Sequence, residues 1–181
     1  SLKHIDWRCY GRTDRFYIKV FEEETNLKSF ILLDKSASMA YTSDNGTDRI
    51  TKLQYGRYLA ASLAYLLVKQ KDAVGMMTFD TEIRSMIQPS STRISLFNLL
   101  KELSNVNHGG ETSFLGIFRT LAEQLKRRGL VIIISDLLDD PDEIISSIKL
   151  FRHRKHEVIV FHVLDKEELG FNFKNESVFE D

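Results

Sequence analysis

The chain has 181 residues, of which 43% are hydrophobic and 28% are charged, and its formal net charge is −1. This composition fits one globular domain with a substantial core, and the balanced charge makes neither nucleic acid nor an anionic membrane surface an expected partner. A lone cysteine, Cys9, allows no intrachain disulfide and is compatible with a reducing cytosol, so we expect a cytoplasmic location. No apolar run approaches the roughly 18 residues of a membrane-spanning helix.

The N-terminal segment, 1–26, is rich in aromatic and charged residues. Residues 15–22 alternate polar and apolar, which predicts a strand that packs on or extends a larger sheet. We expect the main domain over 27–169, followed by a C-terminal tail over 170–181. Because neither end of the sequence has an evident terminal element, we expect the chain to be part of a longer protein, which could be membrane-associated.

Short runs of β-branched and large apolar residues recur from residue 27 onward. They lie at 29–33, 73–79, 130–134 and 157–164, and their nearly continuous apolar character predicts parallel strands that are covered on both faces. The run 82–88 alternates instead, directly after the polar turn 79–81. It predicts an antiparallel edge strand.

Helical patterns separate these runs, because apolar residues recur there at intervals of three and four. The patterns cover 53–67, 114–125 and 144–151. Asp140 and Pro141 are typical of the start of the last helix, and Gly129 is expected to stop the preceding one. Alternation of strand and helix predicts an α/β fold with right-handed crossovers.

Polar residues follow the predicted strands at their carboxyl ends, where α/β sheets carry their sites. Asp34, Ser36 and Ser38 follow the first strand, Asp136 follows the third, and Thr112 lies in a glycine-containing loop that opens a helix. Two carboxylates and three hydroxyls form an oxygen-only ligand set. Such a set suits Mg²⁺ or Mn²⁺ better than Zn²⁺, so these five residues are the predicted metal site.

Two groups of motifs resemble known families. Asp34-x-Ser36-x-Ser38, with the later Thr112 and Asp136, resembles the metal-ion-dependent adhesion site (MIDAS) of von Willebrand factor type A (vWA) domains. Motifs along nearly the whole chain resemble the uncharacterised DUF58 family of bacterial and archaeal proteins: Ile5-Asp6-Trp7-Arg8, Arg12-Thr13-Asp14-Arg15, Phe21-Glu22-Glu23-Glu24-Thr25-Asn26, Arg128-Gly129-Leu130, Ser135-Asp136-Leu137-Leu138, His156-Glu157-Val158 and Val163-Leu164-Asp165.

The resemblance implies a vWA-like three-layer sandwich, Rossmann-like, with a mostly parallel central sheet between helices. It implies that Ser36, Ser38 and Thr112 coordinate the ion directly, and that Asp34 and Asp136 act largely through bound water. The ion then stays electrophilic enough to accept a carboxylate from a partner protein. Relatives of this kind are often linked to MoxR-type AAA+ ATPases, so we predict a non-enzymatic, metal-dependent protein-interaction module that assists the assembly or activation of protein complexes.

Three alternatives remain open at this stage. A Mg²⁺-dependent phosphatase of the haloacid-dehalogenase kind would also use a strand-end aspartate, but it needs a second aspartate two residues later, where this chain has Ser36. The metal site could be vestigial in a domain that only scaffolds. Finally, Ser36 and Ser38 could simply form turn hydrogen bonds and cap the next helix. Lys35 lies where a small or uncharged residue is expected, which affects the charge balance of the site.

Overall fold

The computed structural model describes residues 11–13, 28–43, 50–110, 114–125 and 128–170. Its centre is a five-stranded sheet in the order β3-β2-β1-β4-β5. The strands are β1 (Lys28–Asp34), β2 (Ala73–Phe79), β3 (Ile83–Ser90), β4 (Leu130–Ser135) and β5 (Glu157–His162). All neighbouring pairs are parallel except β2 and β3, so the mostly parallel sheet and its antiparallel edge strand are confirmed.

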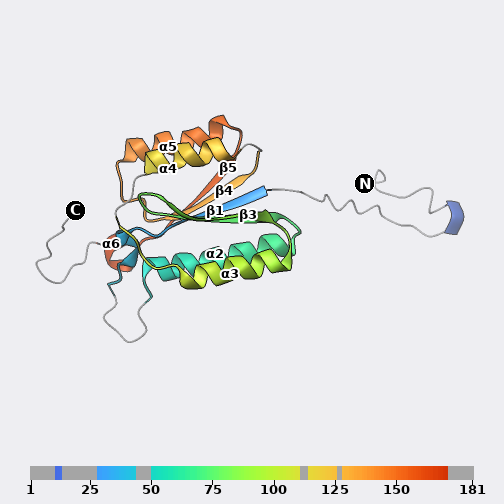
Figure 1. Ribbon diagram of the computed structural model, residues 1–181, viewed down its shortest axis with the longest axis horizontal. Coiled ribbons are helices and arrows are strands. Elements are labelled where there is room, and N and C mark those ends of the chain that lie inside the picture. Colours follow the sequence, from blue (N-terminus) through green and yellow to red (C-terminus); the bar gives the residue numbers. More distant parts are fainter. Residues whose placement is uncertain (1–10, 14–27, 44–49, 111–113, 126–127, 171–181) are drawn as a thin grey trace, which may run out of the picture.

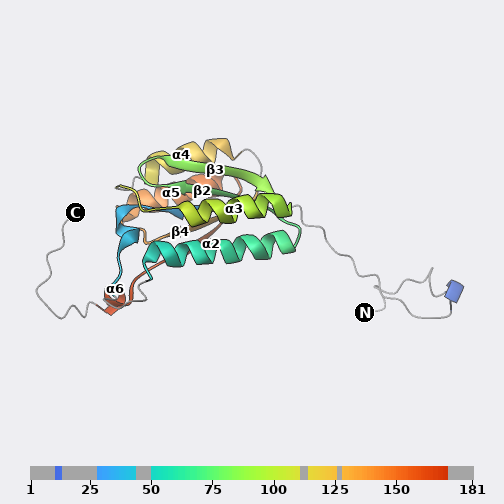
Figure 2. The same ribbon diagram turned by 60° about the horizontal axis from the view of Figure 1, so that its bottom comes forward.

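Helices cover both faces of this sheet, which confirms the three-layer α/β arrangement (Figures 1 and 2). One face carries α4 and α5, and the opposite face carries α2 and α3. A short α6 lies at the end of the molecule where α2 begins. The helices are α2 (Lys52–Lys69), α3 (Arg93–Asn105), α4 (Phe114–Gln124), α5 (Pro141–His153) and α6 (Lys166–Gly170), with a 3₁₀ turn, η2 (Ala37–Ala40), after β1.

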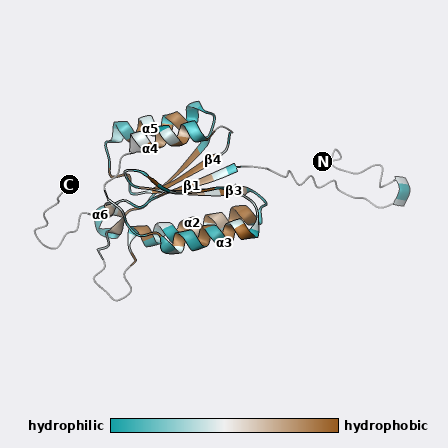
Figure 3. Cartoon of the chain, viewed as in Figure 1, coloured by the Kyte–Doolittle hydropathy of each residue, from teal (hydrophilic) through white to brown (hydrophobic). Residues whose placement is uncertain are grey.

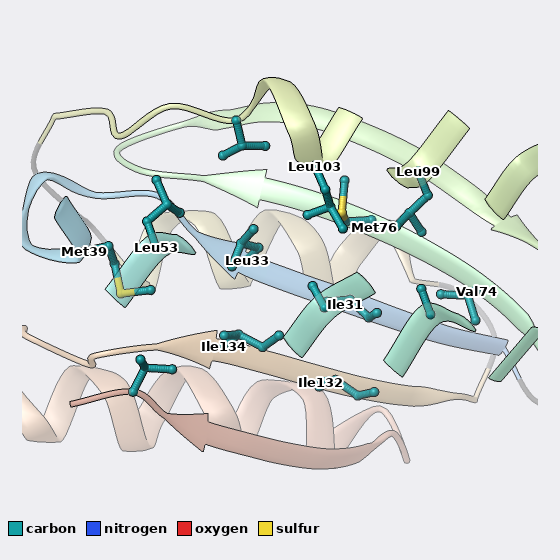
Figure 4. Packing of buried hydrophobic residues seen from close by; sticks show 14 residues of the cluster. Ile31, Leu33, Met39, Leu53, Val74, Met76, Leu99, Leu103, Ile132 and Ile134 are labelled. Atoms are coloured by element: carbon teal, nitrogen blue, oxygen red, sulfur yellow. The ribbon is translucent and has the colours of Figure 1, made fainter. Parts of the chain in front are cut away.

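Strands β1, β2 and β4 are buried along nearly their whole length. Figure 3 colours the chain by the hydropathy of each residue. Successive side chains of a strand point to opposite faces, so β1 contributes Phe30 and Leu32 to the cluster under α4 and α5. Ile31 and Leu33 enter the other cluster, where they meet residues of α2 and α3 (Figure 4). Burial on both faces fixes the position of β1 between the two helical layers. It therefore also fixes the position of the residues that follow the end of the strand.

The helix starts are set by local capping. Thr51 Oγ1 accepts a hydrogen bond from the Gln54 N–H, and the Gln54 side chain binds the Thr51 N–H in return, which begins α2. The predicted start of α5 is confirmed, since Asp140 Oδ1 accepts hydrogen bonds from the N–H groups of residues 142 and 143.

The sequence pattern did not predict helix α3. Apolar residues lie on both its buried and its exposed face, since Ile94 and Phe97 are 76% and 68% exposed. The spacing of apolar residues along the sequence therefore does not show a clear helical period.

The prediction for Gly129 is wrong. Helix α4 ends at Gln124, five residues earlier, so Gly129 does not stop it. A Cβ atom on Gly129 would instead lie 2.2 Å from the Lys28 carbonyl oxygen. The residue must be glycine because the entry to β4 passes directly against the start of β1.

Several expectations lie outside the described residues. They include the strand at 15–22, the N-terminal segment before residue 27 except for a short helical stretch at 11–13, and the tail after 170. The last predicted strand is shorter than expected, since β5 ends at His162. Within the described parts of the chain, no helix has the length and apolar character needed to cross a membrane.

Candidate metal centre

The candidate site lies at the carboxyl edge of the sheet, beside the central strand. Asp34 is the last residue of β1, and Asp136 directly follows β4, the parallel neighbour of β1. The loop after β1 is tied to the strand on the other side, because the Lys35 N–H donates to the Phe79 carbonyl at 2.9 Å. Strand order reverses at β1, which is where open α/β sheets form their binding crevices.

The Asp34 carboxylate is completely buried and held on both oxygens. The Ser36 N–H donates to Oδ1 at 2.8 Å, and the Ser135 hydroxyl donates to Oδ2 at 2.6 Å. Burial raises the pKa of Asp34, although the hydrogen bonds from Ser135 and Ser36 oppose that shift. Each oxygen has a further lone pair, so the fixed carboxylate can still accept from water or face a cation.

Ser36 and Ser38 bring two hydroxyl oxygens next to this carboxylate. Their Oγ atoms lie 3.0 Å apart, and Ser36 is buried while Ser38 is half-buried. Ser36 occupies the position before η2, but its side chain makes no capping hydrogen bond. The alternative in which Ser36 caps the following helix is therefore wrong for its side chain, which instead hydrogen-bonds the Asp34 carboxylate and the Ser38 hydroxyl.

Asp136 is 1% exposed, yet its carboxylate is only partly paired. Oδ2 forms an ion pair with Lys52 Nζ at 2.7 Å, but neither Oδ1 nor Oδ2 has a hydrogen-bond partner among the described residues, and Oδ1 also lacks an ion-pair partner there. The backbone around it is held firmly, because His162 Nε2 contacts the Asp136 carbonyl oxygen at 2.9 Å and Leu137 adopts a φ of 52°. A left-handed leucine costs about 1–2 kcal/mol. A buried carboxylate oxygen without a donor calls for an additional partner.

Thr112 lies outside the described residues, but the loop that leads to it is placed. The Gly109 N–H donates to the Lys35 carbonyl at 2.5 Å, and the Ala37 N–H donates to the Gly110 carbonyl at 2.8 Å. Two backbone hydrogen bonds therefore join this loop to the Asp34 loop, the second of them two residues before Thr112. His108, in the same loop, is exposed.

Asp80 is a third buried carboxylate at this edge, directly after β2. Arg84 Nε lies 2.7 Å from its Oδ1 and 2.9 Å from its Oδ2, and the Glu82 N–H donates to Oδ1 at 3.1 Å. Burial alone would raise the pKa of Asp80, but these hydrogen bonds outweigh it and the pKa is lowered. Asp80 is thus saturated by protein donors and is not a good candidate ligand.

Sequence reasoning missed two residues beside Asp136. Lys52, the first residue of α2, is 4% exposed, and its Nζ lies 2.6 Å from Glu168 Oε1 of α6 as well as near Asp136. One signal was present in the sequence, since a lysine in the first turn of a helix opposes the helix dipole. Glu168 gave no such signal, because an acidic residue in the first turn of a helix is ordinary.

The donor set of this edge fits a hard divalent cation. Within the described residues no group of three or more His, Cys, Asp and Glu side chains gathers that could hold a metal. A carboxylate-rich or imidazole site of the zinc kind is therefore not formed by them. An ion here would need the hydroxyls of Ser36 and Ser38, together with the unpaired oxygen of Asp136, and oxygen donors of low total charge suit Mg²⁺ or Mn²⁺.

Comparison with known proteins gives a match over nearly the whole chain. The family model described as "Protein of unknown function DUF58" matches residues 1–178. Uncharacterised proteins of Mycobacterium tuberculosis and Mycobacterium bovis are 22% identical over 184 residues, which cover 100% of this chain and 56% of each relative. The chain therefore spans about half the length of these curated relatives.

Solved structures share the fold. BatB, a conserved hypothetical protein from Bacteroides thetaiotaomicron, superposes with a TM-score of 0.59 and 16% identity, over 74% of this chain and 65% of that one. An aerotolerance-related membrane protein from Bacteroides fragilis gives a TM-score of 0.60 and 17% identity, over 74% and 66%. At such low identity these likenesses establish the α/β architecture alone.

Proposed function

The chain belongs to the DUF58 family of proteins of unknown function, and we propose that it is a divalent-metal-dependent protein-interaction module rather than an enzyme. In this proposal Ser36, Ser38 and Thr112 hold Mg²⁺ or Mn²⁺, and Asp34 and Asp136 act through bound water, as in the MIDAS of vWA domains. One observation carries it: the buried Oδ1 of Asp136 lacks a hydrogen-bond partner among the described residues at the edge where Asp34 and the serine hydroxyls converge.

The chain's own residues explain why this arrangement favours binding over catalysis. Ser135 and the Ser36 N–H hold Asp34 in one orientation, so it can order water without moving. The position of a phosphatase acid/base is taken by Ser36, whose hydroxyl is paired with that of Ser38. When bound, the ion would supply an electrophilic position for an acidic side chain of a partner protein.

The identity of the partner is proposed from the family resemblance. We expect a protein that presents an acidic residue, and among such proteins a MoxR-type AAA+ ATPase acting in the assembly or activation of protein complexes. The domain would act in the cytoplasm, within a parent that could be membrane-associated. A pull-down with the full-length parent, with and without Mg²⁺, would show whether such an ATPase is retained only when metal is present.

Thermal unfolding in millimolar MgCl₂ or MnCl₂ tests the metal directly. A ligand that binds only the folded state adds about 2.7 kcal/mol when its free concentration is 100 times Kd, so the Tm should rise. Asp34→Ala should abolish the rise. Asp80→Asn is the matched control, because Asp80 is an equally buried aspartate at the same edge and lies outside the proposed ligand set. A wild-type chain whose Tm ignores both metals would contradict the proposal.

Two further measurements separate the alternatives. Turnover of a generic phosphomonoester by the metal-loaded protein, lost in Asp34→Asn, would favour the phosphatase. Partner capture that is unchanged in Asp34→Ala would favour a scaffold with a vestigial site. We expect neither result.

A further inference from the structure

Lys52 is a buried cation inside the candidate metal centre. Its side chain is 2% exposed, and its Nζ lies between two carboxylates, 2.7 Å from Asp136 Oδ2 and 2.6 Å from Glu168 Oε1. The ring of Tyr41 lies 5.6 Å from the ammonium, and the Lys52 N–H donates to the Tyr41 carbonyl at 3.2 Å. Among the described residues, Asp136 and Glu168 are the two carboxylates within ion-pair distance of this ammonium, and the charge of Asp165 also acts on it from further away.

This position is unfavourable for a lysine unless nearby carboxylates compensate its positive charge. Lys52 begins α2, where the helix dipole repels a cation, and the first turn of α2 contains no acidic residue to offset that repulsion. Burial adds a desolvation cost. The compensation therefore comes from Asp136 and Glu168, which lie far away in the sequence, and it is incomplete because Oδ1 of Asp136 accepts no hydrogen bond from the described residues.

Glu168 is held in place independently of Lys52. Its other oxygen, Oε2, accepts from the Asp165 N–H at 2.7 Å. Asp165 in turn accepts from the Ser43 N–H at 3.1 Å and from the Glu167 N–H at 3.0 Å. Glu168 thus offers Lys52 a fixed second carboxylate that does not depend on the state of Asp136.

We infer that Lys52 is the residue that sets the metal affinity of this site: its ammonium competes with the divalent ion for Asp136, and Glu168 retains the ammonium when the ion is present. This inference rests on the proposed function, since it concerns the same site. The ammonium and a divalent ion are both positive and both face the Asp136 carboxylate, so they oppose each other there. The competition weakens binding, so metal occupancy depends on the metal concentration rather than being permanent.

Titration calorimetry with MnCl₂ and MgCl₂ on the full chain tests this inference. Lys52→Met removes the charge and keeps most of the side-chain volume, and it should tighten metal binding by about tenfold or more, because a like charge within a few Å of the ion is lost. Lys52→Gln, which keeps a polar end, should do the same if the methionine variant folds poorly. Glu168→Gln should weaken binding several-fold, since Lys52 then depends on Asp136 alone. Lys69→Met, an exposed lysine of the same helix, is the control and should change nothing.

The outcomes separate the inference from the proposed function. If the wild type binds metal and Lys52→Met binds equally or more weakly, Lys52 only orients Asp136; the inference is then overturned while the proposed function stands. If neither binds Mn²⁺ at millimolar concentration, both are overturned. Measurable wild-type binding that becomes tighter in Lys52→Met supports the inference. Binding seen in the variant alone would overturn the proposed function, because the native chain then holds no metal, and the inference with it.

Discussion

Asp80 and Asp136 occupy equivalent places on either side of β1, but their carboxylates are paired differently. Each follows a parallel neighbour of β1 and each is 1% exposed. Asp80 is saturated by Arg84 and the Glu82 N–H, whereas Asp136 shares one lysine with Glu168 and leaves Oδ1 unpaired in the described part of the chain. A buried strand-end carboxylate is therefore not evidence of a metal site by itself; what distinguishes the two is whether protein donors satisfy it.

The origin of the partners explains the difference. Arg84 is four residues from Asp80, across the tight turn that leads to β3, so the pair forms with the hairpin itself. Lys52 of α2 reaches Asp136, and Glu168 of α6 reaches Lys52, so these partners meet only when the whole domain packs. The Asp80 pair is thus a local structural clamp next to the loop that contains Gly109, whereas the pairing of Asp136 depends on residues far away in the sequence.

Gly109→Ala is expected to give the largest effect on the Asp80 side. A Cβ atom at this position would lie 2.1 Å from Asp80 Oδ2, and that oxygen cannot move freely because Arg84 holds it. We expect a loss of about 2–3 kcal/mol in the free energy of unfolding, measured by urea denaturation. Gly110→Ala is the matched control, since its Cβ would have no neighbour within 4 Å.

A double-mutant cycle tests whether the Asp80 carboxylate causes the cost of Gly109→Ala. In an Asp80→Ala background the clashing carboxylate is gone, so Gly109→Ala should cost clearly less than in the wild type. An equal cost in both backgrounds would show that the alanine is resisted by the backbone of the loop, not by the clamped carboxylate.

Asp80→Asn should give an intermediate effect. The neutral amide keeps the shape but loses the charge-assisted bonds to Arg84, which we expect to lower the unfolding free energy by about 1–2 kcal/mol. Its metal response should stay intact, in contrast to that of Asp34→Ala. A loss of the metal response in Asp80→Asn would show that Asp80 contributes to the metal site and is not only a structural residue.

The smallest effect is expected in the pH dependence. The pKa of Asp80 is lowered from 3.8 in the folded chain, so its stabilising contribution is fully present above that value and is lost as the pH falls through the lowered folded pKa. The stability difference between wild type and Asp80→Asn should therefore shrink steadily as the pH is lowered below about 3.8. Urea unfolding midpoints of both proteins at matched pH values measure this difference. A stability difference that grows as the pH falls would contradict the prediction.

The sequence by itself determined the local parts of this protein. Strand runs, helix stripes and the Asp140 cap depend on residues close together in the chain, because side-chain period and capping geometry are local. For the same reason the carboxyl-end positions of Asp34, Ser36, Ser38 and Asp136 followed from the strands. This reasoning did not predict the helices α3 and α6 or the turn η2, and it assigned the wrong role to Gly129.

Only the tertiary structure decided how the charges around Asp136 are paired. The residues around the candidate centre, at positions 34, 52, 136 and 168, come from four elements, and no periodicity links them. The pairing of Asp136 depends on how α2 and α6 pack against the sheet edge. Burial strengthens charge interactions and makes an unmatched group costly, so these long-range pairings determine the electrostatics around Asp136, which the motif alone does not reveal.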